Sequence, residues 1–372
     1  MIRTINRSKL AAFIILILLY YTSIFAQQIT FTVDENSLDN DGPYVFYQKD
    51  SLLVLEIQNG KVLKLIAAWQ ETKHNLYINS ISKYVTAVKN FQPERKNHFT
   101  DISQYLVISD IHGQFDLFKK LLISNKITDD KLNWIWGSGH LVIAGDVFDR
   151  GPGVTESLWL IFSLSQQAKL AGGKVHFLLG NHELMILEND LRYVNPKYIT
   201  TTEILELKLE ELYAENTLLG NWLRSRPVCL KINDDLIVHA GISPQIADCF
   251  SSPDAINESV YAYLNGNLAD LDLAELLKGS LGPFWYRGYF ISNPKYDLIS
   301  SMEINEIMTK YKTERIIVGH TTYDDILTFQ EDKIINVDAG IKTGRQGKAL
   351  LWKEDTYFIL DESGNSNILL SK

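Results

Sequence analysis

The sequence predicts an α/β fold in which helices alternate with the strands of an open sheet. Its 372 residues are 46% hydrophobic and 22% charged, an ordinary globular composition with enough length for one large domain or two modest ones. From about residue 101 onward, short apolar runs with strand character recur, and each ends in a tight polar turn. Helical patterns follow most of these turns, which is typical of α/β proteins.

The first 26 residues have the features of a secretory signal peptide. Arg3, Arg7 and Lys9 form a basic start, an apolar run extends from Leu10 to about Phe25, and Ala26 ends it. A run of roughly 16 apolar residues is short for a membrane-spanning helix, which usually needs about 20. We therefore expect an exported protein, periplasmic or secreted, without a stable membrane span after cleavage. The alternative is an anchor formed by an uncleaved N-terminal segment.

Net charge limits the class of partner. Removal of residues 1–26 takes away three positive charges and changes the formal net charge from −9 to −12. This acidic balance argues against nucleic acid, whose partners carry a basic face. A small phosphorylated substrate is compatible with this acidic balance if metal ions and a few arginines supply positive charge locally.

The two cysteines, Cys229 and Cys249, do not have the spacing of metal ligands. The sequence allows either a disulfide between them or two buried thiols.

Residues 27–100 are predicted to form a β-rich N-terminal appendage. Tyr44–Tyr47 and Ser51–Ile57 have strand character, residues 58–60 signal a turn, and Lys61–Ile66 resumes the strand pattern, which indicates a hairpin. The segment carries no motif associated with chemistry. We expect it to pack on the main domain, and an accessory binding surface is the alternative.

Residues 101–372 are predicted to form the main domain. Its strand-like runs, each followed by a polar turn, are Tyr105–Ile108, Leu141–Ala144, Val175–Leu179, Leu236–Val238 and Arg315–Val318. Helices are predicted after the first two turns, from Phe115 to Leu122 and from about Val154 to Leu170. In open α/β sheets, loops at the carboxyl ends of different strands converge on one place. Side chains from all five turns are therefore expected to meet.

The side chains in these turns indicate a site for two metal ions. They are all oxygen or nitrogen donors: Asp110, His112, Asp146, Asn181, His239 and His320. Such a mixed set suits Mn, Fe or Zn, and the absence of thiolates argues against a structural zinc site. Six ligands are too many for one catalytic ion that keeps an open position, but they suit two ions bridged by a carboxylate.

The five turns also carry a family resemblance. Their motifs are Ser109-Asp-Ile-His-Gly113, Gly145-Asp-Val-Phe-Asp-Arg-Gly151, Gly180-Asn-His-Glu183, His239-Ala-Gly-Ile-Ser-Pro244 and Gly319-His320. In this order, over about residues 101–360, they resemble the phosphoprotein-phosphatase branch of the calcineurin-like metallophosphoesterases, and bacterial Shewanella-like phosphatases in particular. The resemblance implies two mixed β-sheets flanked by helices in a sandwich. Ser109 stands where this family usually has glycine.

The resemblance further implies a role for each metal-binding side chain. Asp110 and His112 would bind the first metal, Asp146 would bridge, and the second metal would be bound by Asn181, His239 and His320. General metal-ion chemistry supports this arrangement, because the pKa of a water molecule between two cations is lowered toward neutrality. The expected nucleophile is therefore hydroxide, which attacks phosphorus in line.

Four more side chains are expected to act on the substrate. His182 resembles the family's general acid, and Asp149 resembles the partner that orients it. Arg150 is placed to hold two phosphate oxygens with its planar guanidinium. Arg287, in the aromatic-rich segment 282–288, is the second candidate for this role, with packing of its stem against the rings as the alternative.

Long segments between the motifs are expected to form a cap that selects the substrate. They span about residues 184–230 and 245–312, with predicted helices at Glu203–Tyr213 and Thr217–Leu223. Asp338 is predicted either to support the site or to cap its own turn. His140 and His176 match no motif and receive no role.

We therefore expect a metal-dependent phosphomonoester hydrolase. The leading expectation is an exported protein phosphatase acting on phosphoserine, phosphothreonine or phosphotyrosine, or on a small phosphomonoester. The alternative is a nucleotide or dinucleoside-polyphosphate hydrolase on the same fold. A non-catalytic binding protein would be expected to lack a ligand or the acid, and the motifs are complete.

Overall fold

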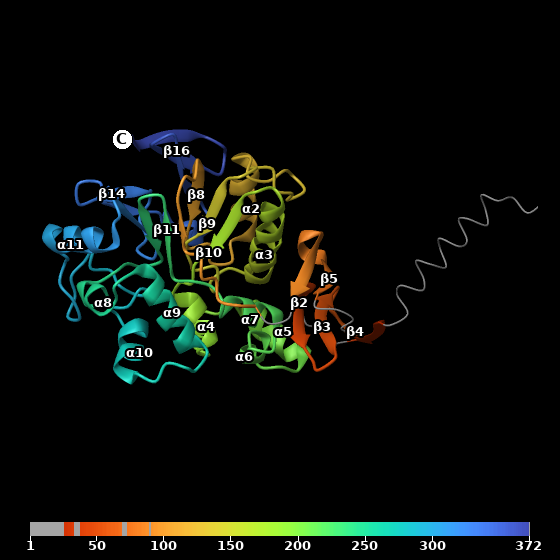
Figure 1. Ribbon diagram of the computed structural model, residues 1–372. Coiled ribbons are helices and arrows are strands. Elements are labelled where there is room, and N and C mark those ends of the chain that lie inside the picture. The colour runs from red at the N-terminus through yellow and green to blue at the C-terminus, as the bar shows by residue number, and fades with distance from the viewer. Residues whose placement is uncertain (1–25, 33–37, 69–72, 89–90, 372) are drawn as a thin grey trace, which may run out of the picture.

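The computed structural model describes residues 26–32, 38–68, 73–88 and 91–371 (Figure 1). Residues 1–25 of the predicted signal peptide lie outside these ranges. Within the described ranges, none of the helices has both the length and the apolar character needed to cross a membrane.

The main domain is an α/β sandwich of two six-stranded mixed sheets, as predicted. The first sheet has the order β10 (Lys174–Phe177), β9 (His140–Ile143), β8 (Gln104–Ile108), β16 (Lys348–Lys353), β17 (Thr356–Asp361), β18 (Ser366–Ser371). The second has the order β14 (Leu327–Phe329), β15 (Ile334–Asn336), β13 (Arg315–Val318), β12 (Asp235–Val238), β11 (Cys229–Ile232), β7 (His98–Phe99). All five predicted strands are present, and β7 shows that the second sheet begins before residue 101.

The core lies between the two sheets and on their outer faces. Along β8, Tyr105 and Val107 belong to a buried cluster that includes Ile237 and Ile317 of the second sheet. The alternate residues Leu106 and Ile108 pack on the helix-covered side. This alternation follows from the two-residue period of a strand, and burial on both faces explains why the strands are apolar throughout.

Two helices cover the outer face of the first sheet (Figure 1). They are α2 (Phe115–Ser124) and α3 (Val154–Leu170), close to the predicted ranges. Trp159 and Phe162 of α3 are buried, as are residues on every side of this helix. An α-helix that is apolar all round needs cover on all sides. Here β10, β2 (Asn40–Tyr47) and β6 (Lys83–Val88) all contact α3.

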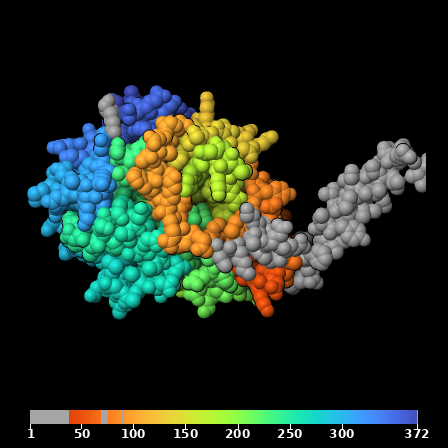
Figure 2. Space-filling model, in the orientation of Figure 1, coloured from red at the N-terminus to blue at the C-terminus, as the bar shows by residue number. Residues whose placement is uncertain are grey.

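The cap consists mainly of short helices, most of which lie below the sandwich in Figure 1, and their residues form the lower part of the surface in Figure 2. They are α4 (Asn181–Leu187), α5 (Pro196–Leu205), α6 (Leu209–Leu212), α7 (Leu218–Leu223), α8 (Pro244–Cys249), α9 (Pro253–Leu264), α10 (Leu271–Lys278) and α11 (Ser301–Tyr311). The prediction of one helix over Glu203–Tyr213 is wrong. The backbone of Glu206 is left-handed, with φ 55°, so α5 ends at Leu205. Short 3-10 turns occur at Asn79–Ile81 and Ile341–Thr343.

The N-terminal segment contains two small antiparallel sheets. The first has the order β1 (Ala26–Thr32), β4 (Lys61–Ala68), β3 (Ser51–Gln58), β2 (Asn40–Tyr47), and includes the predicted hairpin of β3 and β4. The second pairs β5 (Lys73–Ile78) with β6 (Lys83–Val88). The indole Nε1 of Trp159 on α3 donates to the carbonyl of Pro43, at 3.0 Å. The amide of Tyr47 donates to the carbonyl of Asn216 beside α7, at 2.7 Å.

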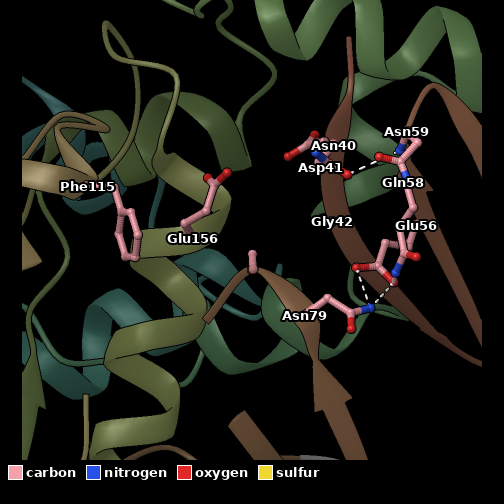
Figure 3. A pocket seen from close by; sticks show the side chains of 10 residues that line it. Asn40, Asp41, Gly42, Glu56, Gln58, Asn59, Asn79, Phe115 and Glu156 are labelled. Atoms are coloured by element: carbon pink, nitrogen blue, oxygen red, sulfur yellow. Dashed lines mark hydrogen bonds between the residues drawn. The ribbon is translucent and has the colours of Figure 1, made fainter. Parts of the chain in front are cut away.

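A polar cavity of about 510 Å³ separates part of this segment from α2 and α3 (Figure 3). Its lining includes Glu56 and Asn79 on one side and Phe115 and Glu156 on the other. Asn79 donates to both carboxylate oxygens of Glu56, at 2.9 and 3.1 Å. Burial raises the pKa of both Glu56 and Glu156. None of the predicted metal ligands lines this cavity.

Candidate metal centre and active site

Five turns at the carboxyl ends of parallel strands meet in the main domain. β8 and β9, β9 and β10, and β12 and β13 are parallel pairs, so their carboxyl ends point the same way. The turns after them bring together eight side chains, all buried: Asp110, His112, Asp146, Asp149, Asn181, His182, His239 and His320. Segments more than 200 residues apart therefore contribute to one site, as the sequence predicted.

Several of these residues adopt an unusual backbone conformation. Asp110, His112, Asp146, Asp149 and His320 all have positive φ, between 45° and 70°. Residues other than glycine rarely adopt this left-handed conformation, and such strain is concentrated at functional sites. The sharp turns direct consecutive polar side chains toward one centre instead of letting them alternate as in a strand.

The first donor group surrounds His112. Its Nδ1 donates to the carbonyl of Phe148 at 2.7 Å, which leaves the lone pair on Nε2. That Nε2 lies 3.5 Å from an oxygen of Asp146 and 3.7 Å from an oxygen of Asp110. Hydrogen bonds to the far ring nitrogen orient metal-binding histidines in this manner.

The second donor group surrounds His239. Its Nδ1 donates to the carbonyl of Ala144 at 2.8 Å, so its Nε2 also presents a lone pair. This Nε2 lies 3.3 Å from Asp146 Oδ1, 3.0 Å from Asn181 Oδ1 and 3.2 Å from His320 Nδ1. Lone pairs packed this closely repel one another unless a cation lies among them. The donor set therefore fits a bound metal ion.

Asp146 is common to both groups. Donor atoms of His112, Asp146 and His182 lie within 4.8 Å of one another, and so do those of Asp146, His239 and His320. Each carboxylate oxygen of Asp146 faces a different group, because Oδ2 is near His112 and Oδ1 is near His239. This is the geometry required of a bridging carboxylate.

The electrostatics of the centre favour positive charge. Burial by itself would raise the pKa of Asp146, but the charges of His239 and His182 hold that pKa well below its ordinary value. Likewise, burial would lower the pKa of His239, yet Asp146 and Asp110 raise it to about 9. The buried carboxylates thus favour a cation at His239 Nε2, either a proton or a metal ion, and the ring offers its lone pair to a metal only when that proton is absent.

His182 and Asp149 form a close pair beside the metal ligands. Asp149 Oδ2 lies 2.5 Å from His182 Nδ1, and both side chains are buried. The other ring nitrogen, Nε2, lies 3.9 Å from Asp146 and therefore faces the centre. The pair has the geometry of an imidazole oriented by a carboxylate.

Glu183 has a structural role that was not predicted from the sequence. Its carboxylate accepts hydrogen bonds from the amides of Asp146 (2.8 Å), Val147 (2.7 Å) and Gly180 (2.7 Å). It thereby ties the turn after β9 to the start of α4. Glutamate at the third position of a helix is a capping-box signal, so its bond to Gly180 could have been predicted. The bonds to the distant turn could not.

Close backbone packing surrounds the centre. A Cβ on Gly180 would lie 2.3 Å from Asp146 Oδ1, and a Cβ on Gly319 would lie 2.0 Å from Ser109 Oγ. The hydroxyl of Ser109, where the family usually has glycine, donates to Asp110 Oδ2 at 2.6 Å. Ser109 therefore orients a predicted metal ligand.

The two predicted phosphate-binding arginines lie in different surroundings. Arg287 Nη1 donates to the carbonyl of His320 at 2.9 Å, which holds the guanidinium beside the metal centre. Arg150 is exposed, and its guanidinium lies 5.2 Å from the ring centre of Tyr193. The Tyr193 ring also contacts His182, with centroids 5.3 Å apart. Tyr193 thus links Arg150 to the site, and no sequence motif had indicated it.

Asp338 caps its own turn, which was one of its two predicted roles; support of the site stays a prediction. Its Oδ1 accepts a hydrogen bond from the amide of Gly340 at 3.2 Å, which caps the turn. Its Oδ2 accepts one at 2.6 Å from Oγ1 of Thr322, a residue two positions after His320.

The two cysteines are unpaired. Cys229 is buried as expected, but Cys249 is exposed at the end of α8, so the prediction of two buried thiols is wrong for it.

The protein is a sandwich of two mixed sheets, and the ends of its strands carry buried Asp, His and Asn donors around a shared carboxylate. This arrangement defines the class of metal-dependent hydrolases with paired metal sites. The sequence model of the calcineurin-like phosphoesterases matches residues 104–324, and the chain belongs to this family. It is a phosphoester hydrolase, and the resemblance predicted from the five motifs is confirmed.

Individual relatives agree. The crystal structure of a cold-active protein-tyrosine phosphatase from a psychrophilic Shewanella is 34% identical, with a TM-score of 0.79, covering 89% of this chain and all of that one. Shewanella-like protein phosphatase 2 of Arabidopsis thaliana is 22% identical over 67% of this chain and 74% of that relative. A symmetrical bis(5'-nucleosyl)-tetraphosphatase of Buchnera aphidicola is 27% identical over 70% of this chain and 98% of that relative.

Proposed function

We propose that this chain is an exported, metal-dependent phosphomonoesterase that removes phosphate from proteins or peptides. The observation that carries the proposal is the His182–Asp149 pair, at 2.5 Å, directed at two donor groups that share Asp146. A serine or tyrosine leaving group needs a proton as it departs, and such a pair can supply one.

The metal ions would be held by the residues already described. Asp110 and His112 fit one ion, Asn181, His239 and His320 fit the other, and Asp146 fits both. Mn, Fe and Zn all suit this donor set. When bound, a pair of such ions supplies positive charge for the phosphoryl oxygens and lowers the pKa of a coordinated water.

The chain's own side chains perform the remaining tasks. Asp149 accepts a hydrogen bond from His182 Nδ1–H, which fixes the ring so that Nε2 is directed at the leaving oxygen. Arg287 and Arg150 would hold phosphoryl oxygens from two sides of the centre. Both are permanently charged, and the planar fork of each can make two parallel hydrogen bonds.

The first experiment is hydrolysis of p-nitrophenyl phosphate by the chain from Gln27 after chelation and readdition of Mn, Fe, Zn or Mg. Asp146→Asn is compared with Asp116→Asn, the same change at a 91% exposed side chain on α2. We expect metal-dependent turnover that Asp146→Asn abolishes and Asp116→Asn retains. Two bound metals with no turnover of any phosphomonoester would refute the proposal.

The second candidate function is hydrolysis of dinucleoside polyphosphates. It is favoured by the Buchnera tetraphosphatase, 98% of whose length this chain covers. Rates on phosphopeptides and on diadenosine tetraphosphate, measured with the same metal-loaded protein, separate the two. A kcat/KM at least tenfold higher for the nucleotide would replace the proposed function with this one.

Export is tested at the N-terminus. We expect the full chain, expressed in a bacterium with an export pathway, to appear outside the cytoplasm with Gln27 as its first residue. Full-length protein retained in the membrane fraction would favour the uncleaved anchor, and cytoplasmic protein would refute export.

A further inference from the structure

A cavity of about 640 Å³ adjoins the metal centre. It lies between two parts of the cap: the end of α4 with the loop after it, and the segment from the end of α10 to residue 296. In sequence these two walls are almost 100 residues apart. Its lining includes one aromatic ring, one thioether and six charged side chains: Trp285, Met185, Glu188, Asp190, Arg192, Lys278, Arg287 and Lys295.

The walls of this cavity touch predicted metal ligands. The ring of Trp285 lies edge-on to His320, with centroids 5.8 Å apart, and Arg287 donates to the carbonyl of His320. On the opposite wall, the sulfur of Met185 lies 4.0 Å from the side-chain nitrogen of Asn181. The cavity therefore lies next to the metal centre, within reach of a molecule whose phosphate is bound there.

The cavity carries more positive than negative charge. Four basic side chains and two acidic ones line it, in a chain whose formal net charge is −9. Arg192 and Asp190 form an ion pair, with 2.6 Å between Nη2 and Oδ2. The carboxylate of Glu188 accepts a hydrogen bond from the hydroxyl of Tyr263.

Two of the four basic groups have no carboxylate partner. Lys278 pairs with Glu275 at 2.7 Å, outside the lining. In the described part of the chain, neither Arg287 nor Lys295 forms an ion pair, and the Arg287 hydrogen bonds go to uncharged oxygens. A positively charged guanidinium and ammonium thus line the same cavity without an ion-pair partner, although the carboxylate of Glu188 also lines it.

We propose that this cavity binds acidic side chains next to the phosphorylated residue of a peptide substrate. With Arg287 holding the phosphate, carboxylates there would gain Lys295 as their charge partner, and Trp285 offers an apolar surface for the stems of the same side chains. The inference rests on the proposed function, since it requires a phosphopeptide at the metal centre. It adds a sequence preference to that function.

The test compares three phosphopeptides of equal length that differ only in the residues flanking the phosphorylated one: glutamate, glutamine or lysine. We expect kcat/KM for the acidic peptide to exceed that for the neutral one by about two- to fivefold per charge pair, the range of partly exposed ion pairs. The preference should fall at 0.5 M NaCl, since added salt shortens the Debye length from about 10 Å at 0.1 M.

Charge reversal at Lys295 tests whether this residue causes the preference for acidic peptides. Lys295→Glu should bring the ratio of acidic to neutral kcat/KM to one or below, and Lys295→Ala should give an intermediate ratio. Because each ratio is taken within one variant, a partial loss of folded protein cancels. Lys120→Glu, the same charge change at an exposed position on α2, should keep the wild-type ratio.

The outcomes separate this inference from the proposed function. Turnover of all three peptides at equal kcat/KM would overturn the acidic preference and leave the phosphatase intact. A preference that Lys295→Glu does not reduce would also overturn it, because the acidic side chains would then bind elsewhere. Turnover of p-nitrophenyl phosphate without turnover of any peptide would refute the proposed protein phosphatase itself.

Discussion

Glu183→Gln offers a direct test of how the metal-binding turns are held in place. One carboxylate oxygen of Glu183 accepts from the amides of Asp146 and Gly180, and the other accepts from those of Val147 and Phe148, the last at 3.3 Å. All four partners are donors. The amide group of glutamine has one oxygen and one NH₂, so in either orientation its NH₂ faces two backbone N–H groups.

The cost follows from this count. The less damaging orientation turns the NH₂ toward Val147 and Phe148 and loses one short and one long bond. A hydrogen bond to a charged group contributes about 1.5–3 kcal/mol, and a buried unsatisfied donor costs a similar amount. Neutralising a fully buried carboxylate returns part of this, since burial raises the pKa of Glu183. We expect a net loss of about 2–3 kcal/mol in the free energy of unfolding.

The assay is thermal unfolding together with metal titration by calorimetry. A loss of this size should lower the Tm by roughly 4–12 °C, given about 2–4 °C per kcal/mol for large domains. Metal affinity should fall about 10–100-fold, as for other groups that orient metal ligands. Glu203→Gln, the same change at an exposed position on α5, should shift stability by less than about 0.5 kcal/mol. Unchanged Tm and affinity in Glu183→Gln would refute the reasoning.

Three further predictions concern the acid, the close packing and the response to pH. His182→Asn should lower kcat on alkyl phosphates by about 10²–10⁴-fold with unchanged metal content, and by less on p-nitrophenyl phosphate; equal losses on both substrates in steady-state assays would contradict a proton donor. Gly319→Ala should destabilise the fold by about 1–3 kcal/mol in urea unfolding, since the new Cβ would lie 2.0 Å from Ser109 Oγ. Ser109→Gly in the same chain should recover part of that loss, and no recovery would place the clash elsewhere. Burial lowers the pKa of His140 to about 4 and holds that of His176 well below its ordinary value, so both stay neutral in the fold at neutral pH but take up protons near pH 6.5 when unfolded. Stability should therefore fall as pH drops from 6.5 toward 4, by up to about 1.4 kcal/mol per pH unit for each histidine, and urea unfolding of His176→Gln should show a shallower slope.

Local patterns in the sequence predicted the strand ends and the donors that follow them. Asp110, Asp146 and His239 each come within three residues of the end of a buried strand, and the carboxyl ends of parallel strands meet. Periodicity placed α3 correctly because a long helix repeats its signal over many residues. It failed at Glu206, where one left-handed residue interrupts a pattern that is otherwise helical.

The sequence by itself determined the class of chemistry, since donor types and their order along the chain are local properties. Only the tertiary structure decided which groups meet across long separations. It brought Glu183 to the turn after β9, Tyr193 to His182, and Lys295 into one cavity with Arg192. No periodic signal encodes such contacts, because they depend on how the cap segments pack against the sandwich after their own helices have formed. The residues of the metal centre could therefore be predicted from the sequence, whereas the surface proposed to receive the substrate could not.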